Sequence, residues 1–264
     1  MRIWHQSSVD LENYPHYHAS MLRHYEKILH PDTQMTFVGV PVDTWGGLSP
    51  SDFIGSPYLY QQTLSNLLYT NCLRAEREGY DAFVIGSYTA PFLRECRSLV
   101  NIPVISMPES TILVGCSMAQ KIGLVTLNDE NRWFLQTMVS SNKFEGRIAG
   151  IEVVEPALNE KELEDAFADP TDYIARFTEV SRRVIAMGAD VIVPAEGIVA
   201  EVVYKAGLTE IDGVCVMDGI GIPLAYAQML GSLHRSTGLH AGRKWHYVSP
   251  GAEALARFPP LARG

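Results

Sequence analysis

The stretch MGADVIVPAEGIVAE, residues 187–201, reads as the end of one helix, a buried strand and the start of another helix. Gly188 ends the first helical pattern, and the short apolar run VIVPA (191–195) follows it like a strand of a parallel sheet. Glu196 and Gly197 come directly after this run. A carboxylate therefore stands where a buried strand ends, and the rest of the chain must explain why.

A second stretch, EGYDAFVIGSYTAPF (78–92), follows the same template. Each stretch ends a helix at a glycine, Gly79 or Gly188, places an aspartate two residues later and continues as an apolar strand. Six residues after each aspartate come Ser87 and Glu196. Ligands of open α/β sheets bind outside the carboxyl ends of the strands. The repeat therefore predicts two similar lobes, with Ser87 and Glu196 on opposite walls of one cleft.

Short apolar runs alternate with helical patterns along the remaining chain. The runs expected as buried strands are MTFVGV (35–40), AFVIGS (82–87), IPVISM (102–107), KIGLVTL (121–127), VIVPA (191–195) and VCVMD (214–218), with RIWHQ (2–6) as a weaker one. Amphipathic helices are expected over Tyr58–Glu78 and Asp172–Met187, and a last helix is expected to stop at Gly238. This alternation predicts an α/β fold of mostly parallel sheets flanked by helices.

Composition bounds the class of protein. The 264 residues suffice for one large domain or two modest ones, and the formal net charge is −9. This charge argues against a nucleic-acid or anionic-membrane partner, because binding to phosphates needs a basic patch. No apolar run approaches the roughly 18 residues of a membrane span, and the first residues lack a long apolar signal core, so we expect a cytoplasmic protein. The four cysteines form no CxxC pair, so neither a zinc site nor a redox dithiol is indicated.

Several of these stretches together resemble the aspartate/glutamate/hydantoin racemase superfamily, nearest to its hydantoin- and allantoin-racemase-like branch. The segments that carry the resemblance are EREGYDAFVIGSYTAPFLRECRSLVNIPVISMPES, KIGLVTLND, GADVIVPAEG and VMDGIGIPLAYAQML. The resemblance implies two pseudo-symmetric α/β lobes with the active site in the cleft between them. It implies no metal, pyridoxal phosphate or flavin as a cofactor, and a small molecule as substrate.

The same resemblance predicts how the chain divides. Residues 1–112 plus 218–264 are expected to form the first lobe, and residues 113–217 the second. The Pro-, Gly- and Ala-rich tail SPGAEALARFPPLARG (249–264) is expected to run over the surface or over a neighbouring subunit. Because members of the family tend to form homo-oligomers, the resemblance implies a homo-oligomer here as well.

The chain departs from the family at both catalytic turns. Racemases of this kind carry a cysteine at each turn, one on each face of the substrate carbon, whereas here the positions hold Ser87 and Glu196. A serine hydroxyl needs a neighbouring base before it can act as a nucleophile. Glu196 can be a base, because burial in a dry cleft raises the pKa of a carboxyl group. The structural alternatives are an N-cap serine at Ser87 and a helix-capping carboxylate at Glu196.

Other wall residues follow from their positions in the family pattern. The family binds substrate oxygens with backbone N–H groups and hydroxyls at the strand-to-helix turns, which are ready anion sites. The matching residues here are Tyr88, Thr89, Thr126, Gly197 and Ile198. The alternative for each of them is ordinary turn chemistry.

The stretch WHQSS (4–8) replaces the Asn-Pro-Asn-Thr-like turn that is common after the family's first strand. We therefore expect His5, Gln6 and Ser7 to reach the cleft. His5 is a candidate catalytic residue, because imidazole titrates near neutrality, although a lone histidine can equally be a satisfied structural residue. The Gly- and Ser-rich stretch at 43–57 is expected to be a long loop, either a lid or a surface excursion.

The expected protein is a cofactor-independent enzyme that acts on a small carboxylate, amide or ureide. One base opposed by one hydroxyl fits single-base proton transfer, and the family resemblance favours an isomerase. Decarboxylation, or hydrolysis by water that Glu196 activates, is the alternative in which Ser87 donates a hydrogen bond or acts as nucleophile. A small-molecule-binding protein without catalysis is the second alternative.

Overall fold

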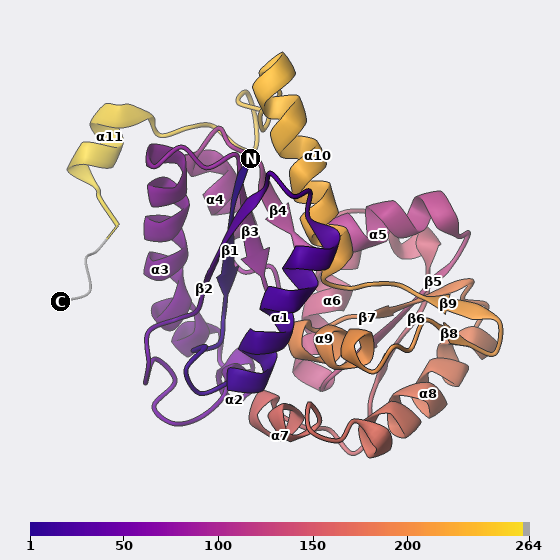
Figure 1. Ribbon diagram of the computed structural model, residues 1–264. Helices are drawn as coiled ribbons and strands as arrows, with labels where there is room; N and C mark the ends of the chain where they lie inside the picture. Colours follow the sequence, from indigo (N-terminus) through magenta and orange to yellow (C-terminus); the bar gives the residue numbers. More distant parts are fainter. Residues whose placement is uncertain (261–264) are drawn as a thin grey trace.

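A computed structural model describes residues 1–260 of the chain (Figure 1). Nine strands form two separate sheets within these residues. The first sheet has the order β2-β1-β3-β4, built from Gln34–Val38, Arg2–Ser7, Ala82–Gly86 and Val104–Ser106. The second has the order β6-β5-β7-β9-β8, built from Ile148–Val153, Ile122–Thr126, Val191–Pro194, Val214–Val216 and Glu210–Ile211. All neighbours are parallel except β8 and β9, so the predicted α/β fold with two lobes is confirmed.

Helices cover both faces of the first sheet. The helices of this lobe are α1 (Pro15–Ile28), α2 (Pro50–Ile54), α3 (Pro57–Arg77), α4 (Leu93–Leu99), α5 (Met107–Met118) and α10 (Gly221–Thr237). Strand alternation sends Phe83 and Ile85 into the cluster that α3 and α4 bury, and Val84 into the cluster shared with α1 and α10. Burial on both faces explains why these strands read as continuous apolar runs.

The second lobe is built in the same way around its own sheet. Its helices are α6 (Asp129–Ser141), α7 (Glu160–Asp165), α8 (Thr171–Ala186) and α9 (Gly197–Lys205), with a 3-10 turn at Glu145–Arg147. Helix α8 packs against β5, β6 and β7, and α9 packs against β7. The chain then returns to the first lobe through α10 (Figure 1).

The internal repeat has a structural counterpart. β1 and β3 pair as β5 and β7 do, and each pair is the centre of its sheet. The Asp81 carboxylate accepts a hydrogen bond from the backbone N–H of Arg2 at 2.6 Å, and the Asp190 carboxylate accepts one from that of Lys121 at 3.0 Å. Gly79 and Gly188 both end their helices with positive φ, 75° and 96°. Ser87 and Glu196 therefore occupy equivalent places in the two lobes.

The structure corrects several expectations. Residues 43–57 are not all loop, because Pro50–Ile54 form α2, which begins with a capping box between Ser49 and Asp52. The N-cap alternative for Ser87 is wrong, because the next helix begins only at Leu93.

The division of the chain stays a prediction. The expected boundary at residue 112 lies inside α5, which packs against strands of both sheets. The C-terminal tail forms α11 (Gly251–Arg257) on the side of α3, away from the second lobe (Figure 1), and residues 261–264 lie outside the described residues. Within residues 1–260, no helix is both long and apolar enough to cross a membrane.

Candidate active site

The turns after β3 and β7 meet between the lobes. The Tyr88 hydroxyl donates a hydrogen bond to the backbone carbonyl of Gly219 at 2.9 Å. A Cβ atom placed on Gly219 would lie 2.7 Å from the Tyr88 hydroxyl and equally 2.7 Å from the Pro194 carbonyl oxygen. Tyr88, which follows Ser87, and Pro194, the last residue of β7, thus both contact Gly219. This contact brings together the two turns that the sequence singled out.

Glu196 both caps a helix and has a shifted pKa. It is the N-cap of α9, and its carboxylate accepts a hydrogen bond from the backbone N–H of Val199 at 2.9 Å. Burial and, to a smaller extent, the charge of Glu160 together raise the pKa of Glu196 to about 8, because the N–H groups at the start of α9 only partly oppose them. The capping carboxyl group therefore exchanges its proton near neutral pH, as a general base must.

Glu160 is the neighbouring acid that sequence reasoning missed. Its Oε1 accepts a hydrogen bond from the Ser51 hydroxyl at 2.7 Å, and its Oε2 accepts one from the Ser51 backbone N–H at 3.2 Å. Burial raises the pKa of Glu160, while these donors and Ser49 favour its ionised form. Because Ser51 lies on α2 and Glu160 begins α7, the pair joins the two lobes. The only local signal was an acidic helix start in a run of charged residues.

Ser87 belongs to a chain of hydroxyl groups. Its Oγ lies 2.9 Å from the Thr89 Oγ1, which in turn lies 2.7 Å from the Tyr60 hydroxyl on α3. Burial raises the pKa of Tyr60 to about 12, although the hydrogen bonds from Thr89 and Ser87 oppose that rise. Among the described residues, Ser87 makes no hydrogen bond to a carboxylate, imidazole or amine group. The arrangement suits hydrogen bonding to a ligand and lacks the neighbouring base of an activated nucleophile.

Two buried tyrosine hydroxyls near the acids have no partner. Within residues 1–260, the hydroxyls of Tyr14 and Tyr173 make no hydrogen bond although both side chains are buried. Burial raises the pKa of each, and the charge of Glu196 raises both further. Buried polar groups are normally hydrogen-bonded, so an unpaired pair beside a titrating carboxyl group marks a place for a ligand.

The charges around these tyrosines are mostly negative. The carboxylates that raise the pKa of Tyr14 are those of Glu160, Asp10, Glu196 and Glu164. The Arg176 guanidinium lowers the pKa of Tyr173 against the effect of burial, but it already bonds to Asp172 and to a backbone carbonyl. A ligand that carries its own carboxylate would meet repulsion here.

Tyr17 contacts both Ser7 and Gly197. A Cβ atom on Gly197 would lie 3.8 Å from the Tyr17 hydroxyl, and a hydrogen bond to Ser7 lowers the pKa of Tyr17 against the dominant effect of burial. The end of β1 is therefore connected to the start of α9. Ile198 follows Gly197 as a buried residue in the first turn of that helix.

His5, Gln6 and Thr126 lie beneath this region and are bonded to protein groups. The Nδ1 of His5 lies 2.9 Å from the Tyr25 hydroxyl, and burial lowers the pKa of His5 to about 3, which leaves the ring neutral. The Gln6 amide nitrogen donates to backbone carbonyls at 3.0 to 3.2 Å. The Thr126 hydroxyl donates to the Ala195 carbonyl at 2.9 Å. The contacts of Gln6 and Thr126 fit structural roles, whereas the buried Nε2 of His5 has no hydrogen-bond partner within residues 1–260. Substrate contact by any of the three stays a prediction.

A small cavity inside the first lobe borders Ser87. The cavity that Ser7, Ser8 and Ser87 line has a volume of about 10 Å³, which suits one water molecule. A larger groove of about 400 Å³ lies outside, and Ser51 and Asn159 contribute to its wall.

Comparison with known proteins gives a consistent picture. A family model described as Asp/Glu/Hydantoin racemase matches residues 19–215. A hydantoin racemase from Pseudomonas sp. (strain NS671) is 25% identical over 165 residues, which cover 62% of this chain and 64% of that protein. The chain thus matches slightly less than two thirds of that relative's length.

Solved structures share the fold. An allantoin racemase from Klebsiella pneumoniae superposes with a TM-score of 0.71 at 18% identity, covering 95% of this chain and 94% of that one. An allantoin racemase from Pseudomonas fluorescens gives a TM-score of 0.71 at 16% identity over 100% of both chains. An aspartate racemase homologue from Pyrococcus horikoshii gives 0.57 at 13% identity, covering 88% and 99%.

Proposed function

Because this chain belongs to the Asp/Glu/hydantoin racemase family, we propose that it is an isomerase that transfers a proton on a small, uncharged amide or ureide, with Glu196 as the base. The observation that carries the proposal is the buried Glu196 carboxyl, whose pKa is raised to about 8 at the end of β7. A base with a pKa near the working pH combines availability with proton affinity.

The chemistry is a proton transfer at a carbon next to a carbonyl group. The Glu196 carboxylate takes the proton, and the electrons of the broken C–H bond move into the carbonyl, which becomes an enolate. The hydroxyls of Ser87, Tyr14 and Tyr173 are the donors available to the enolate oxygen. The enolate is planar, so the carbon inverts when the enolate turns its other face to Glu196 before the carboxylic acid returns the proton. The cycle then ends with Glu196 ionised again and the enolate neutralised.

Charge selects the substrate class. The acids around Tyr14 disfavour a second carboxylate, so aspartate and glutamate fit this site poorly. Two of the similar proteins are named after hydantoin and allantoin. Both compounds are uncharged ureides with an acidic C–H group next to a carbonyl group. We therefore propose compounds of that kind, rather than amino dicarboxylates, as substrates.

The test follows the proton in D₂O. Single enantiomers of 5-substituted hydantoins and of allantoin, incubated with the protein, should gain deuterium at the α-carbon faster than protein-free samples, as NMR would show. Glu196→Gln should lower this rate by about 10²-fold or more, the usual contribution of a general base. Glu179→Gln, an exposed carboxylate on α8, is the control and should keep the rate.

Each other outcome contradicts the proposal in a distinct way. Full exchange by Glu196→Gln would remove Glu196 as the base. Products with a cleaved ring or lost CO₂ would indicate a hydrolase or lyase, for which Ser87 lacks a neighbouring base. Saturable binding of these ureides without exchange would indicate a binding protein.

A further inference from the structure

A second cavity lies away from Ser87, where helices of the two lobes meet. Its volume is about 530 Å³, within the range of about 300 to 1,000 Å³ that small-molecule sites occupy. Helix α1 of the first lobe forms one wall, and α9, residues 207–209 and residues 216–218 form the others. None of the residues that line the 10 Å³ cavity at Ser87 lines this one.

The floor of this cavity is a hydrogen-bonded cluster around His24. The His24 ring stacks parallel on Tyr204 with ring centroids 3.4 Å apart. Its Nδ1 lies 2.7 Å from a Glu201 carboxylate oxygen, and its Nε2 lies 2.9 Å from Asp218 Oδ2. Asp218 Oδ1 accepts the backbone N–H groups of Ile220 and Gly221 at 3.0 and 2.7 Å. Among the described residues, both carboxylates of this floor pair with His24, and neither forms an ion pair with a lysine or arginine at the rim.

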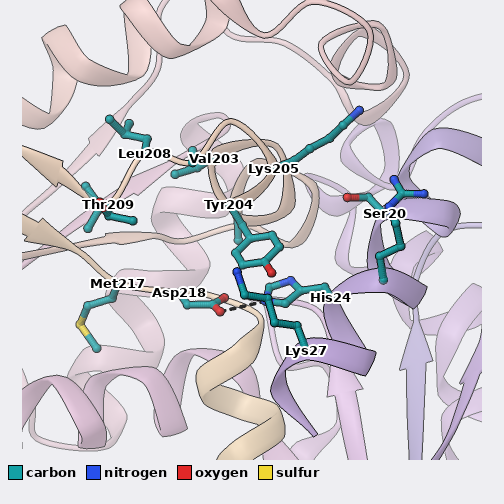
Figure 2. A pocket seen from close by; sticks show the side chains of 14 residues that line it. Ser20, His24, Lys27, Val203, Tyr204, Lys205, Leu208, Thr209, Met217 and Asp218 are labelled. Atoms are coloured by element: carbon teal, nitrogen blue, oxygen red, sulfur yellow. Dashed lines mark hydrogen bonds and ion pairs between the residues drawn. The ribbon is translucent and has the colours of Figure 1, made fainter.

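Two cations on α1 stand at that rim without an ion-pair partner. Arg23 and Lys27 are four residues apart, so they lie on one face of the helix. Among the described residues neither makes a salt bridge, and Lys27 Nζ lies 5.4 Å from the centre of the Tyr204 ring. Figure 2 shows Lys27 extending from α1 toward Tyr204 and Asp218. Unpaired cations at a cavity mouth are conspicuous in a chain of net charge −9.

The opposite side of the cavity is apolar. Leu208, Val216 and Met217 line it, together with Val203 from α9. In Figure 2, Leu208 and Met217 lie across the cavity from Ser20. An inorganic ion would leave this wall uncovered, whereas an organic anion with an apolar body would contact both sides.

From these contacts we infer a second binding site, for a small organic anion whose carboxylate or phosphate group lies between Arg23 and Lys27 and whose apolar body packs toward Leu208 and Met217. Because the walls come from both lobes, the ligand bridges them. The site is separate from the proposed proton-transfer chemistry, and its test measures binding without any use of activity.

Isothermal titration calorimetry at constant ionic strength would test the site with four matched probes. Benzoate and phenyl phosphate are the anions, benzamide is the neutral analogue and benzylamine is the cation. We expect saturable binding of benzoate, phenyl phosphate or both, which tells the two anion types apart. The double substitution Arg23→Ala with Lys27→Ala should weaken that binding about tenfold or more, because charge-assisted hydrogen bonds are lost. Arg77→Ala, an exposed cation on α3, should leave it unchanged.

A second variant tests the cavity itself without changing any charge. Thr209→Trp places a large ring in the cavity from an exposed position and should abolish binding without touching Arg23 or Lys27. The inference fails if neither anion binds saturably, or if benzamide binds as tightly as benzoate. It also fails if the double variant and Thr209→Trp both bind the anions as tightly as the unaltered protein.

Discussion

At the scale of single residues, Glu196 shows how one side chain can cap a helix and still titrate near neutrality. A carboxylate at a helix N-terminus is normally stabilised in its charged form. Here the loss of water and the charge of Glu160 outweigh the three N–H groups at the start of α9, so the pKa rises to about 8. The capping geometry fixes the position of the carboxyl group, and its environment sets its basicity.

The pairing with Glu160 predicts a shift in the pH dependence of the proposed reaction. With Glu196 as base, kcat/KM should rise with pH, reach half its maximum near pH 8 and level off above that pH. Glu160→Gln removes a neighbouring negative charge, so the pKa of Glu196 should fall and the plateau should begin about one pH unit lower. Steady-state rates from pH 5 to 9 would measure this shift.

A carbon-13 NMR titration of the Glu196 carboxyl would give the same pKa in a variant too slow for kinetics. Glu179→Gln serves as the control with an unchanged profile. An unaltered pKa of Glu196 in Glu160→Gln would show that the two carboxylates do not interact.

At the scale of elements, α9 positions Glu196 at its N-terminus and contacts α1 near its C-terminus. Its N-terminus holds Glu196, and its last two turns carry Glu201 and Tyr204, which meet α1. The spacing of three residues puts Glu201 and Tyr204 on one face of the helix, as the spacing of four does for Ser20 and His24 on α1. The Ser20 hydroxyl and His24 thus both reach the Glu201 carboxylate, at 2.6 and 2.7 Å, inside a closed interface.

This interface predicts how stability depends on pH. Burial lowers the pKa of His24, but hydrogen bonds to Asp218 and Glu201 outweigh it and raise the pKa to about 9 from 6.5. A raised histidine pKa stabilises the fold fully below pH 6.5, and the contribution disappears as pH rises through 9. The shift corresponds to about 3 kcal/mol in the free energy of unfolding. Urea unfolding at pH 6 and pH 9.5 would measure the loss.

The same measurements on His24→Gln isolate the contribution of His24 to the free energy of unfolding. Glu160 and Glu196 titrate in both proteins, so their contributions cancel in the difference. The variant should be less stable than the unaltered protein at pH 6, and the gap should close toward pH 9.5. Equal pH dependence of the two proteins would contradict a charged His24 in the folded state.

At the scale of the whole molecule, the features that could be predicted from the sequence are those that depend on residues near one another in the chain. The repeat and the buried strands needed only neighbouring residues, so two lobes and the positions of Ser87 and Glu196 could be inferred. The burial of His5 and Gln6 could not, because β1 lies inside its sheet and both of its faces are covered. β6 was missed because IAGIEV lacks a strong apolar run.

Contacts between the lobes were beyond sequence reasoning. Ser20 and Glu201 are 181 residues apart, and Ser51 and Glu160 are 109 residues apart. Ser20, Ser51 and Glu160 stand in no motif, and the repeat that ends at Glu201 does not indicate its partner. Only the packing of α1 on α9 and the contact between α2 and α7 bring these residues together. The acid beside Glu196 and the second cavity both depend on such distant pairs.

The route of the chain through the lobes has a mechanical consequence. The second sheet is inserted between α5 and α10, so β1 and α10 both belong to the first lobe (Figure 1). When an optical trap pulls on β1 and on the end of α10, tension reaches the first lobe before the second. The first rupture should release first-lobe segments at about 3.3 to 3.6 Å per residue and leave the second lobe intact. Handles at Lys143 and Glu210 should reverse that order, and rupture of both lobes in one step from either pair would show that they share load as one body.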